Sequence, residues 1–195
     1  MGEQLNLPVF STSLDPKSKS RQLAVRAVEH LRAAGHTSEL IDLTQTPLAP
    51  FDNYEVFQGP AYESLHQMIS AADAIVLAAP IYNWSIGSTA KGFVEATGAT
   101  GENGRRAAWF DKVVTFLFAG GLPHSYMAFN QIASSMMLDF KCVINPYALY
   151  VSARDWQAID TLSADRTARL TKTLDVHAEL ASLLKERSYR SDWEV

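Results

Sequence analysis

The chain has 195 residues, a length that suits one domain with a full hydrophobic core. Hydrophobic residues make up 47% of it and charged residues 19%, which is the ordinary composition of a globular protein. The net charge of −4 argues against a general nucleic-acid surface, and the single cysteine excludes an internal disulfide and a multi-cysteine metal site.

The first residues and the lengths of the apolar runs indicate where the protein resides. The N-terminus lacks a basic segment followed by a long apolar core, so we expect no secretory signal. No apolar run approaches the ~20 residues that are needed to span a bilayer. We therefore expect a cytoplasmic protein with no membrane or nucleic-acid partner. We expect one domain over residues 1–195, with the tail at 188–195 docking on its own domain or on another subunit.

Apolar runs alternate with stretches of helical periodicity along the whole chain. The apolar runs predict five strands, at residues 5–10, 39–43, 74–79, 113–119 and 142–151. The helical stretches lie at residues 18–34, 61–71, 88–97, 129–138 and 162–184, and residues 44–60 form a long irregular connection. Strands that alternate with helices predict right-handed βαβ units and a parallel sheet. We expect a doubly wound α/β fold with five strands in the order 2-1-3-4-5 and helices on both faces.

Local signals refine the element boundaries. Gly35 closes the first helix, and Ser88 is expected to cap the third. Pro80 is expected to end the third strand, and Asn145-Pro146 interrupts the fifth.

The connection between the first strand and the first helix, residues 11–20, is rich in hydroxyl groups and basic side chains. A helix N-terminus offers unpaired amides and a partial positive charge, and it therefore favours an anion. The connection contains no glycine, so it matches neither the triphosphate-binding loop nor the glycine-rich dinucleotide motif. It is either a phosphate site or a solvated serine-rich loop with a redundant helix cap.

The segment after the third predicted strand, residues 80–85, reads PIYNWS. Two aromatic rings and an amide at a strand end suit a flat heteroaromatic ligand with polar edges. The alternative is that Tyr82 and Trp84 cover the end of the sheet or an oligomer contact.

Paired glycines, Gly120 and Gly121, follow the fourth predicted strand. Without a Cβ atom they allow the backbone to approach a ligand closely, or they form a tight turn between strand and helix. His124 lies just beyond them and is either a surface residue or a contact to substrate or cofactor.

These three connections follow strands one, three and four of the predicted sheet. In the order 2-1-3-4-5 the direction of winding reverses beside strand one, so all three connections meet at one crevice. The sequence therefore predicts a composite ligand site at the carboxyl ends of the strands.

The three segments together resemble those of the NADPH-dependent FMN reductase family of flavodoxin-like proteins. Thr12-Ser13 with residues 18–24 is similar to the first loop of that family, residues 80–85 to its P-E-Y-N-x-S loop, and Ala119–Gly121 to its glycine pair. The resemblance spans about residues 5 to 155. It implies a flavodoxin-like fold, an FMN cofactor, and NADPH or NADH as co-substrate.

By this resemblance, three serines would hold the FMN phosphate, the 80–85 segment would line the isoalloxazine ring, and the glycine pair would lie at its pyrimidine edge. The residues expected to bind the cofactor are Ser13, Lys17, Ser18, Ser20, Pro80, Ile81, Tyr82, Asn83, Trp84, Ser85, Gly120 and Gly121. Asp15 stands where the family often has an arginine. Because an acid beside a phosphate is unfavourable, we expect Lys17 to turn inward or Asp15 to turn outward.

The resemblance implies an oxidoreductase that transfers a hydride from NAD(P)H to FMN and then passes electrons to a small-molecule acceptor, free flavin or quinone. The flavin carries the chemistry, so no catalytic side chain and no metal are expected. The alternatives are a quinone, azo or metal-ion reductase on the same fold, a flavodoxin-like electron carrier, and a flavin-free binding protein. The resemblance also implies a homodimer or homotetramer, with the helices after strands three and four at the contact.

Overall fold

The computed structural model of the protein describes residues 3–101 and 104–192. A parallel sheet runs through its centre in the order β2 (Leu40–Asp42), β1 (Val9–Ser11), β3 (Ala74–Tyr82), β5 (Val113–Ala119) and β6 (Val143–Ile144). The fifth position is continued by β7 (Leu149–Val151), which pairs with β5 in parallel after the interruption at Asn145-Pro146. The predicted doubly wound fold and its strand order are confirmed.

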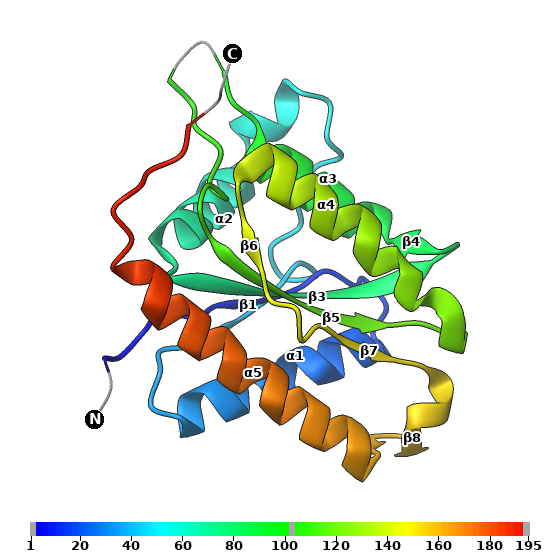
Figure 1. Ribbon diagram of the computed structural model, residues 1–195. Coiled ribbons are helices and arrows are strands. Elements are labelled where there is room, and N and C mark those ends of the chain that lie inside the picture. Colours follow the sequence, from blue (N-terminus) through cyan, green and yellow to red (C-terminus); the bar gives the residue numbers. More distant parts are fainter. Residues whose placement is uncertain (1–2, 102–103, 193–195) are drawn as a thin grey trace.

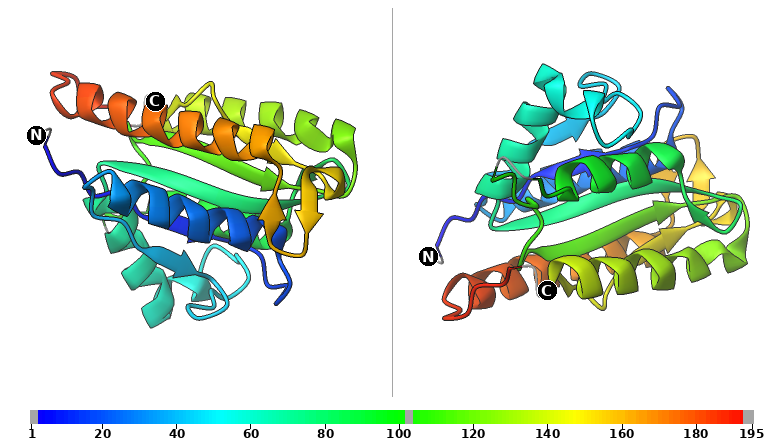
Figure 2. Two further views of the ribbon diagram at one scale, coloured as in Figure 1. Left: turned by 90° about the horizontal axis from the view of Figure 1, so that it is seen from below. Right: turned by 90° about the horizontal axis from the view of Figure 1, so that it is seen from above.

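Helices cover both faces of the sheet (Figures 1 and 2). One face carries α1 (Lys19–Ala33) and α5 (Ala164–Lys185), and the other carries α2 (Pro60–Ala71), α3 (Ser88–Gly98) and α4 (Ala128–Phe140). Side chains of β3 alternate between the two cores, because successive residues of a strand point to opposite faces. Val76 packs in the core under α1 and α5, whereas Ile75 and Leu77 pack in the core under the other three helices.

The first strand is shorter than the predicted run of residues 5–10. Leu5 and Leu7 are buried in an extended segment that pairs with Thr37. Pro8 has no N–H group to donate, so the regular ladder begins only at Val9.

The third strand is longer than predicted, and the expectation that Pro80 ends it is wrong. Pro80 pairs with Ala119 of β5, and the chain then turns back in a hairpin that joins β3 to β4 (Ser85–Ile86). Proline is tolerated here because β1 pairs with β3 only as far as Ala78, so no neighbour on that side needs an N–H donor.

The helix boundaries follow local capping chemistry. Ser18 caps α1 and accepts the Arg21 amide, within the predicted boundary. Ser88 is the first residue of α3 rather than its cap, because Gly87 occupies the cap position without a side-chain bond. The predicted helix start at Leu162 is also wrong, since α5 begins at Ala164 behind the cap residue Ser163.

The segment before α5 forms a two-stranded hairpin instead of the first helical turn. Its strands are β8 (Trp156–Ala158) and β9 (Thr161–Leu162). Three short 3-10 helices complete the fold: η1 (Glu55–Gln58), η2 (Pro123–Met127) and η3 (Ala153–Asp155). Within residues 3–101 and 104–192, no helix combines the length and apolar character that crossing a bilayer requires.

Candidate functional site

A cavity of about 530 Å³ opens at the carboxyl ends of β1, β3 and β5. It brings together the three connections that the sequence placed at one crevice. The cavity is lined by Ser13, Asp15, Ser18, Lys19, Ser20, Pro80, Ile81, Tyr82, Ala119, Gly120, Gly121, Val151, Ser152, Ala153 and Trp156. Eight of the twelve predicted cofactor-binding residues are in this set; Lys17, Asn83, Trp84 and Ser85 are not.

One end of the cavity is formed by hydroxyl groups at the N-terminus of α1. The Ser18 and Ser20 hydroxyls lie 2.9 Å apart and are buried, and Ser18 also accepts the Arg21 amide. The first amides of a helix have no carbonyl partner within it, and the helix dipole adds partial positive charge. This end of the cavity therefore has the donors that bind a phosphate group.

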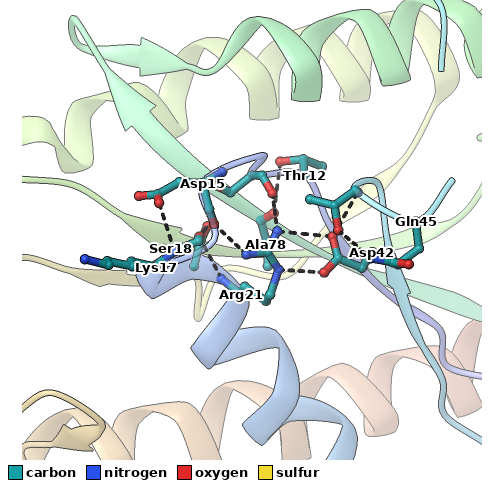
Figure 3. A network of polar contacts seen from close by, with 11 residues as sticks. Thr12, Asp15, Lys17, Ser18, Arg21, Asp42, Gln45 and Ala78 are labelled. Atoms are coloured by element: carbon teal, nitrogen blue, oxygen red, sulfur yellow. Dashed lines mark hydrogen bonds and ion pairs between the residues drawn. The ribbon is translucent and has the colours of Figure 1, made fainter. Parts of the chain in front are cut away.

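The acidic side chain in this loop is engaged by the backbone. Asp15 lines the cavity, and its Oδ1 atom accepts the Lys17 amide at 2.8 Å. Figure 3 shows the Lys17 side chain extending away from the surrounding polar network. Lys17 is exposed and does not line the cavity, so of the two expected arrangements the structure does not show the one in which Lys17 turns inward.

Lys19 is the basic residue that lines the cavity. Its ammonium group lies 4.2 Å from the centre of the Trp156 ring and donates to the Ile159 carbonyl. The residue thereby connects the start of α1 to the β8–β9 hairpin, and the sequence pattern did not single it out.

The apolar wall of the cavity comes from the end of β3. Pro80, Ile81 and Tyr82 line it, and the chain then turns through Asn83 and Trp84, whose φ angles are 49° and 65°. A two-residue turn with both residues left-handed matches the twist of a β-hairpin. For a residue as bulky as tryptophan this conformation is strained, and such strain gathers at functional sites.

The hairpin turn borders a second hollow of about 420 Å³. This hollow shares Ile81, Tyr82 and Gly121 with the first cavity. Its other walls are Asn83, Trp84, Leu122 and Ser125. None of the seven residues carries a charge, and the Tyr82 and Trp84 side chains are 56% and 53% exposed.

Ser85, the last residue of the predicted ring-binding segment, lies apart from both hollows. Its hydroxyl donates to Gln131 of α4, so it ties the β3–β4 hairpin to that helix. His124 is exposed and lines neither hollow.

The two glycines after β5 serve different neighbours. A Cβ atom at Gly120 would lie 2.6 Å from the Tyr150 hydroxyl, whereas one at Gly121 would meet no atom within 4 Å. The Tyr150 hydroxyl donates to the Leu122 carbonyl and fixes the turn, and burial raises the pKa of this phenol. The absence of a side chain at Gly120 thus leaves space for the Tyr150 hydroxyl. The absence of one at Gly121 leaves the backbone open to the cavity.

The sequence prediction missed the wall that follows β7, although a signal for it exists. Ser152 and Asp155 form a reciprocal capping box over η3, the S-x-x-D pattern that marks a helix start. Burial alone would raise the pKa of Asp155, but hydrogen bonds from Ser152 and Arg166 hold that pKa below its ordinary value. The turn that carries Ala153 and Trp156 to the cavity is therefore firmly braced.

A parallel sheet in this order, with a hydroxyl-lined helix start and an apolar wall at its carboxyl edge, defines a flavodoxin-like α/β protein with a ligand site at the carboxyl ends of its strands. The family model of NADPH-dependent FMN reductase matches residues 5–155. The chain therefore belongs to the NADPH-dependent FMN reductase family, and its cofactor and electron donor are FMN and NAD(P)H.

A curated relative agrees with this assignment, and two solved structures share the fold. FMN-dependent NADH:quinone oxidoreductase 2 of Bradyrhizobium diazoefficiens is 32% identical, over 59% of this chain and 68% of the relative. The flavoenzyme FerB, an NAD(P)H:(acceptor) oxidoreductase of Paracoccus denitrificans, superposes with a TM-score of 0.73 at 17% identity, covering 92% of this chain and 98% of its own. An NAD(P)H:quinone oxidoreductase of Methanothermobacter marburgensis gives 0.64 at 17%, covering 91% and 100%. At these identities the two structures show a shared fold.

Proposed function

We propose that the cavity holds FMN, with its phosphate at the start of α1 and its ring between the end of β3 and the glycine pair. The observation that carries this proposal is that the hydroxyl set of Ser18 and Ser20 and the open backbone of Gly121 line one cavity. A volume of about 530 Å³ lies in the range of small-molecule sites. Bound FMN would supply two-electron chemistry between NAD(P)H and an acceptor.

The chain's own residues would bind and orient the cofactor rather than react with it. Ser18 and Ser20 would donate to the phosphate, and Gly121 would admit the ring edge without a side chain in the way. Ile81 and Tyr82 would exclude water from one side of the ring, because their side chains form the wall shared by the two hollows.

We propose further that the acceptor is a neutral, flat, conjugated molecule of the quinone class. The second hollow adjoins the cavity, has an exposed aromatic wall and carries no charged side chain. Aromatic rings stack on such surfaces, whereas an anionic acceptor would find no compensating charge there. The curated relative is named as a quinone reductase, which favours the same class. Free flavin is the second candidate, since it also presents a flat ring.

Steady-state oxidation of NADH and of NADPH tests this function with free FMN, FAD, neutral quinones and azo dyes as acceptors. We expect oxidation that depends on bound FMN, with a lower KM for neutral quinones than for free flavins. A colourless protein with no flavin-dependent oxidation of either nicotinamide would reject the enzyme function. Tight FMN binding without nicotinamide turnover would indicate an electron carrier instead.

We also propose that the chain forms a homodimer or homotetramer through α3 and α4. Large apolar side chains are exposed on α4 and on the turn before it: Tyr126, Met127, Met137 and Leu138. Light scattering of the purified protein is expected to give a mass of two or four chains. A monomer at micromolar concentration would contradict the proposal.

A further inference from the structure

The loop between β1 and α1 is held by Arg21, a largely buried arginine on the first turn of α1. The Arg21 guanidinium donates to the Ser13 carbonyl at 2.6 Å and to the Asp15 carbonyl at 2.5 Å. Its Nε and Nη2 groups also donate to the two carboxylate oxygens of Asp42 at the end of β2, at 2.6 and 3.3 Å. Figure 3 shows Arg21 between the loop and Asp42. Arg21 is absent from the set of residues that line the cavity.

The arginine and its acid partner form a fixed unit. Their side chains are only 17% and 16% exposed, so both are largely withdrawn from solvent. Burial alone would raise the pKa of Asp42, but the hydrogen bond and charge of Arg21, with hydrogen bonds from Thr44, hold that pKa below its ordinary value. A planar guanidinium with several fixed donors can join one carboxylate and two carbonyls at once, which a lysine cannot do.

These contacts decide which way the loop peptides face. In a trans peptide the C=O group of one residue and the N–H group of the next point in opposite directions. Because the Ser13 carbonyl points at Arg21, the Leu14 amide points away from Arg21. This amide has no hydrogen-bond partner within the described part of the chain. Two carbonyl oxygens, at Ser13 and Asp15, are likewise held on Arg21 and neutralised by its charge.

The loop has no glycine, so its peptides lack the freedom by which glycine-rich loops aim their amides at an anion. We infer that Arg21, anchored by Asp42, is a positioning residue for the phosphate end of the cofactor. It keeps the carbonyl oxygens of Ser13 and Asp15, two residues that line the cavity, off the anion without itself touching the phosphate. This inference rests on the proposed binding of FMN in the cavity.

The test compares the affinities of the full-length protein for FMN and riboflavin, which differ only in the phosphate. Flavin fluorescence quenching gives both dissociation constants, and thermal unfolding reports the fold. For Arg21→Met we expect the Kd of FMN to rise about tenfold or more, as for loss of a charge-assisted hydrogen-bond set, while the Kd of riboflavin changes less than about twofold. Arg21→Lys is expected to restore only part of the loss, because its ammonium is a compact point charge without the planar fork of donors that a guanidinium has.

The matched control is Arg32→Met, on the same helix. Arg32 also donates to a backbone carbonyl, that of Ser38, but at the far end of α1. We expect this variant to bind FMN and riboflavin as the parent protein does. If Arg21→Met does not fold, Arg21→Gln replaces it, since this change also removes the guanidinium charge and its fork of donors but keeps a polar side chain.

The outcomes separate the inference from the function on which it rests. A parent protein that binds neither flavin rejects the FMN site and the role of Arg21 with it. A parent protein that binds FMN, with Arg21→Met weakening FMN and riboflavin equally, or leaving both unchanged, rejects the role of Arg21 alone.

Discussion

At Gly120 and Gly121, two adjacent residues of one type lack side chains for different reasons. Gly120 lies against the Tyr150 hydroxyl, and Gly121 faces open space in the cavity. We expect Gly120→Ala to lower the free energy of unfolding by about 1–2 kcal/mol, because the new methyl displaces the hydroxyl from the Leu122 carbonyl. Gly121→Ala is expected to leave stability within about 0.5 kcal/mol and to weaken FMN binding.

Urea unfolding and FMN titration of both variants check this division. Tyr150→Phe in the Gly120→Ala background is expected to recover part of the lost stability, since it removes the nearest atom. Equal losses of stability in the two alanine variants would contradict the assignment.

Trp84 combines an exposed aromatic ring with a left-handed backbone. The turn does not need the Trp84 side chain in order to fold, because glycine adopts this left-handed backbone without strain. We expect Trp84→Gly to keep stability within about 1 kcal/mol and to raise the KM for a neutral quinone several-fold, with the Kd of FMN unchanged. Trp84→Phe, which keeps an aromatic wall, is the control. An unchanged quinone KM in Trp84→Gly would show that this ring does not bind the acceptor.

Helix α3 carries two glycines that offer a matched comparison. A Cβ atom at Gly92 would meet nothing within 4 Å, whereas one at Gly98 would overlap the buried Phe140 ring. Gly92→Ala is expected to raise the free energy of unfolding by about 0.5–1 kcal/mol through helix propensity. Gly98→Ala is expected to lower it by about 1–3 kcal/mol through overpacking. Chemical denaturation measures both values, and two changes of the same sign would contradict the packing of α3 on α4.

Elements with a clear hydrophobic periodicity in the sequence were predictable. Elements that depend on which strands pair with each other were not. Helix α1 follows from Leu23, Ala27 and Leu31 on one face and from Ser18 at its start. The β3–β4 hairpin was hidden because Pro80 reads as a strand terminator, and only the absence of β1 beside it makes proline acceptable. The β8–β9 hairpin was hidden because Leu162 fits the helical spacing of α5 as well as it fits a strand.

A buried polar contact joins helix α5 to strand β5 on one face of the sheet. His177 of α5 is fully buried, and its Nδ1 atom lies 2.9 Å from the Thr115 hydroxyl of β5. The Asn145 amide donates to the same hydroxyl, so three buried side chains share one hydrogen-bond network. Burial, with a smaller effect of the His36 charge, lowers the pKa of His177 from 6.5 to about 3.

This link makes global stability depend on pH. In the unfolded chain His177 takes up a proton below its pKa of 6.5, whereas in the folded protein it does so only near 3. Stability from this residue is present above pH 6.5 and is lost as the pH falls from 6.5 towards 3. We expect the free energy of unfolding to drop by about 2 kcal/mol between pH 7 and pH 5 from this residue.

Urea unfolding at pH 7, 6 and 5 measures that slope. His177→Gln is expected to be flatter over this range, and His124→Gln, at an exposed position, is expected to match the parent protein. A His177→Gln variant with the full parental slope would contradict the account.

At the scale of the whole site, topology was predictable and side-chain direction was not. The strand order alone brings the connections after β1, β3 and β5 to one crevice. Whether Lys17 or Lys19 faces the cavity depends on where α1 begins and on the Lys17 amide's bond to Asp15. The Trp156 wall depends on a capping box and a hairpin that follow the last paired strand.

The central claim is that the hydroxyls at the start of α1 hold the phosphate of FMN. Titration of FMN into the parent protein and the double variant Ser18→Ala, Ser20→Ala tests it most directly. The control is Ser163→Ala, which removes the equivalent helix cap of α5 at a residue that does not line the cavity. We predict that the double variant raises the Kd of FMN about tenfold or more while Ser163→Ala leaves it unchanged. An unchanged Kd in the folded double variant would contradict the account.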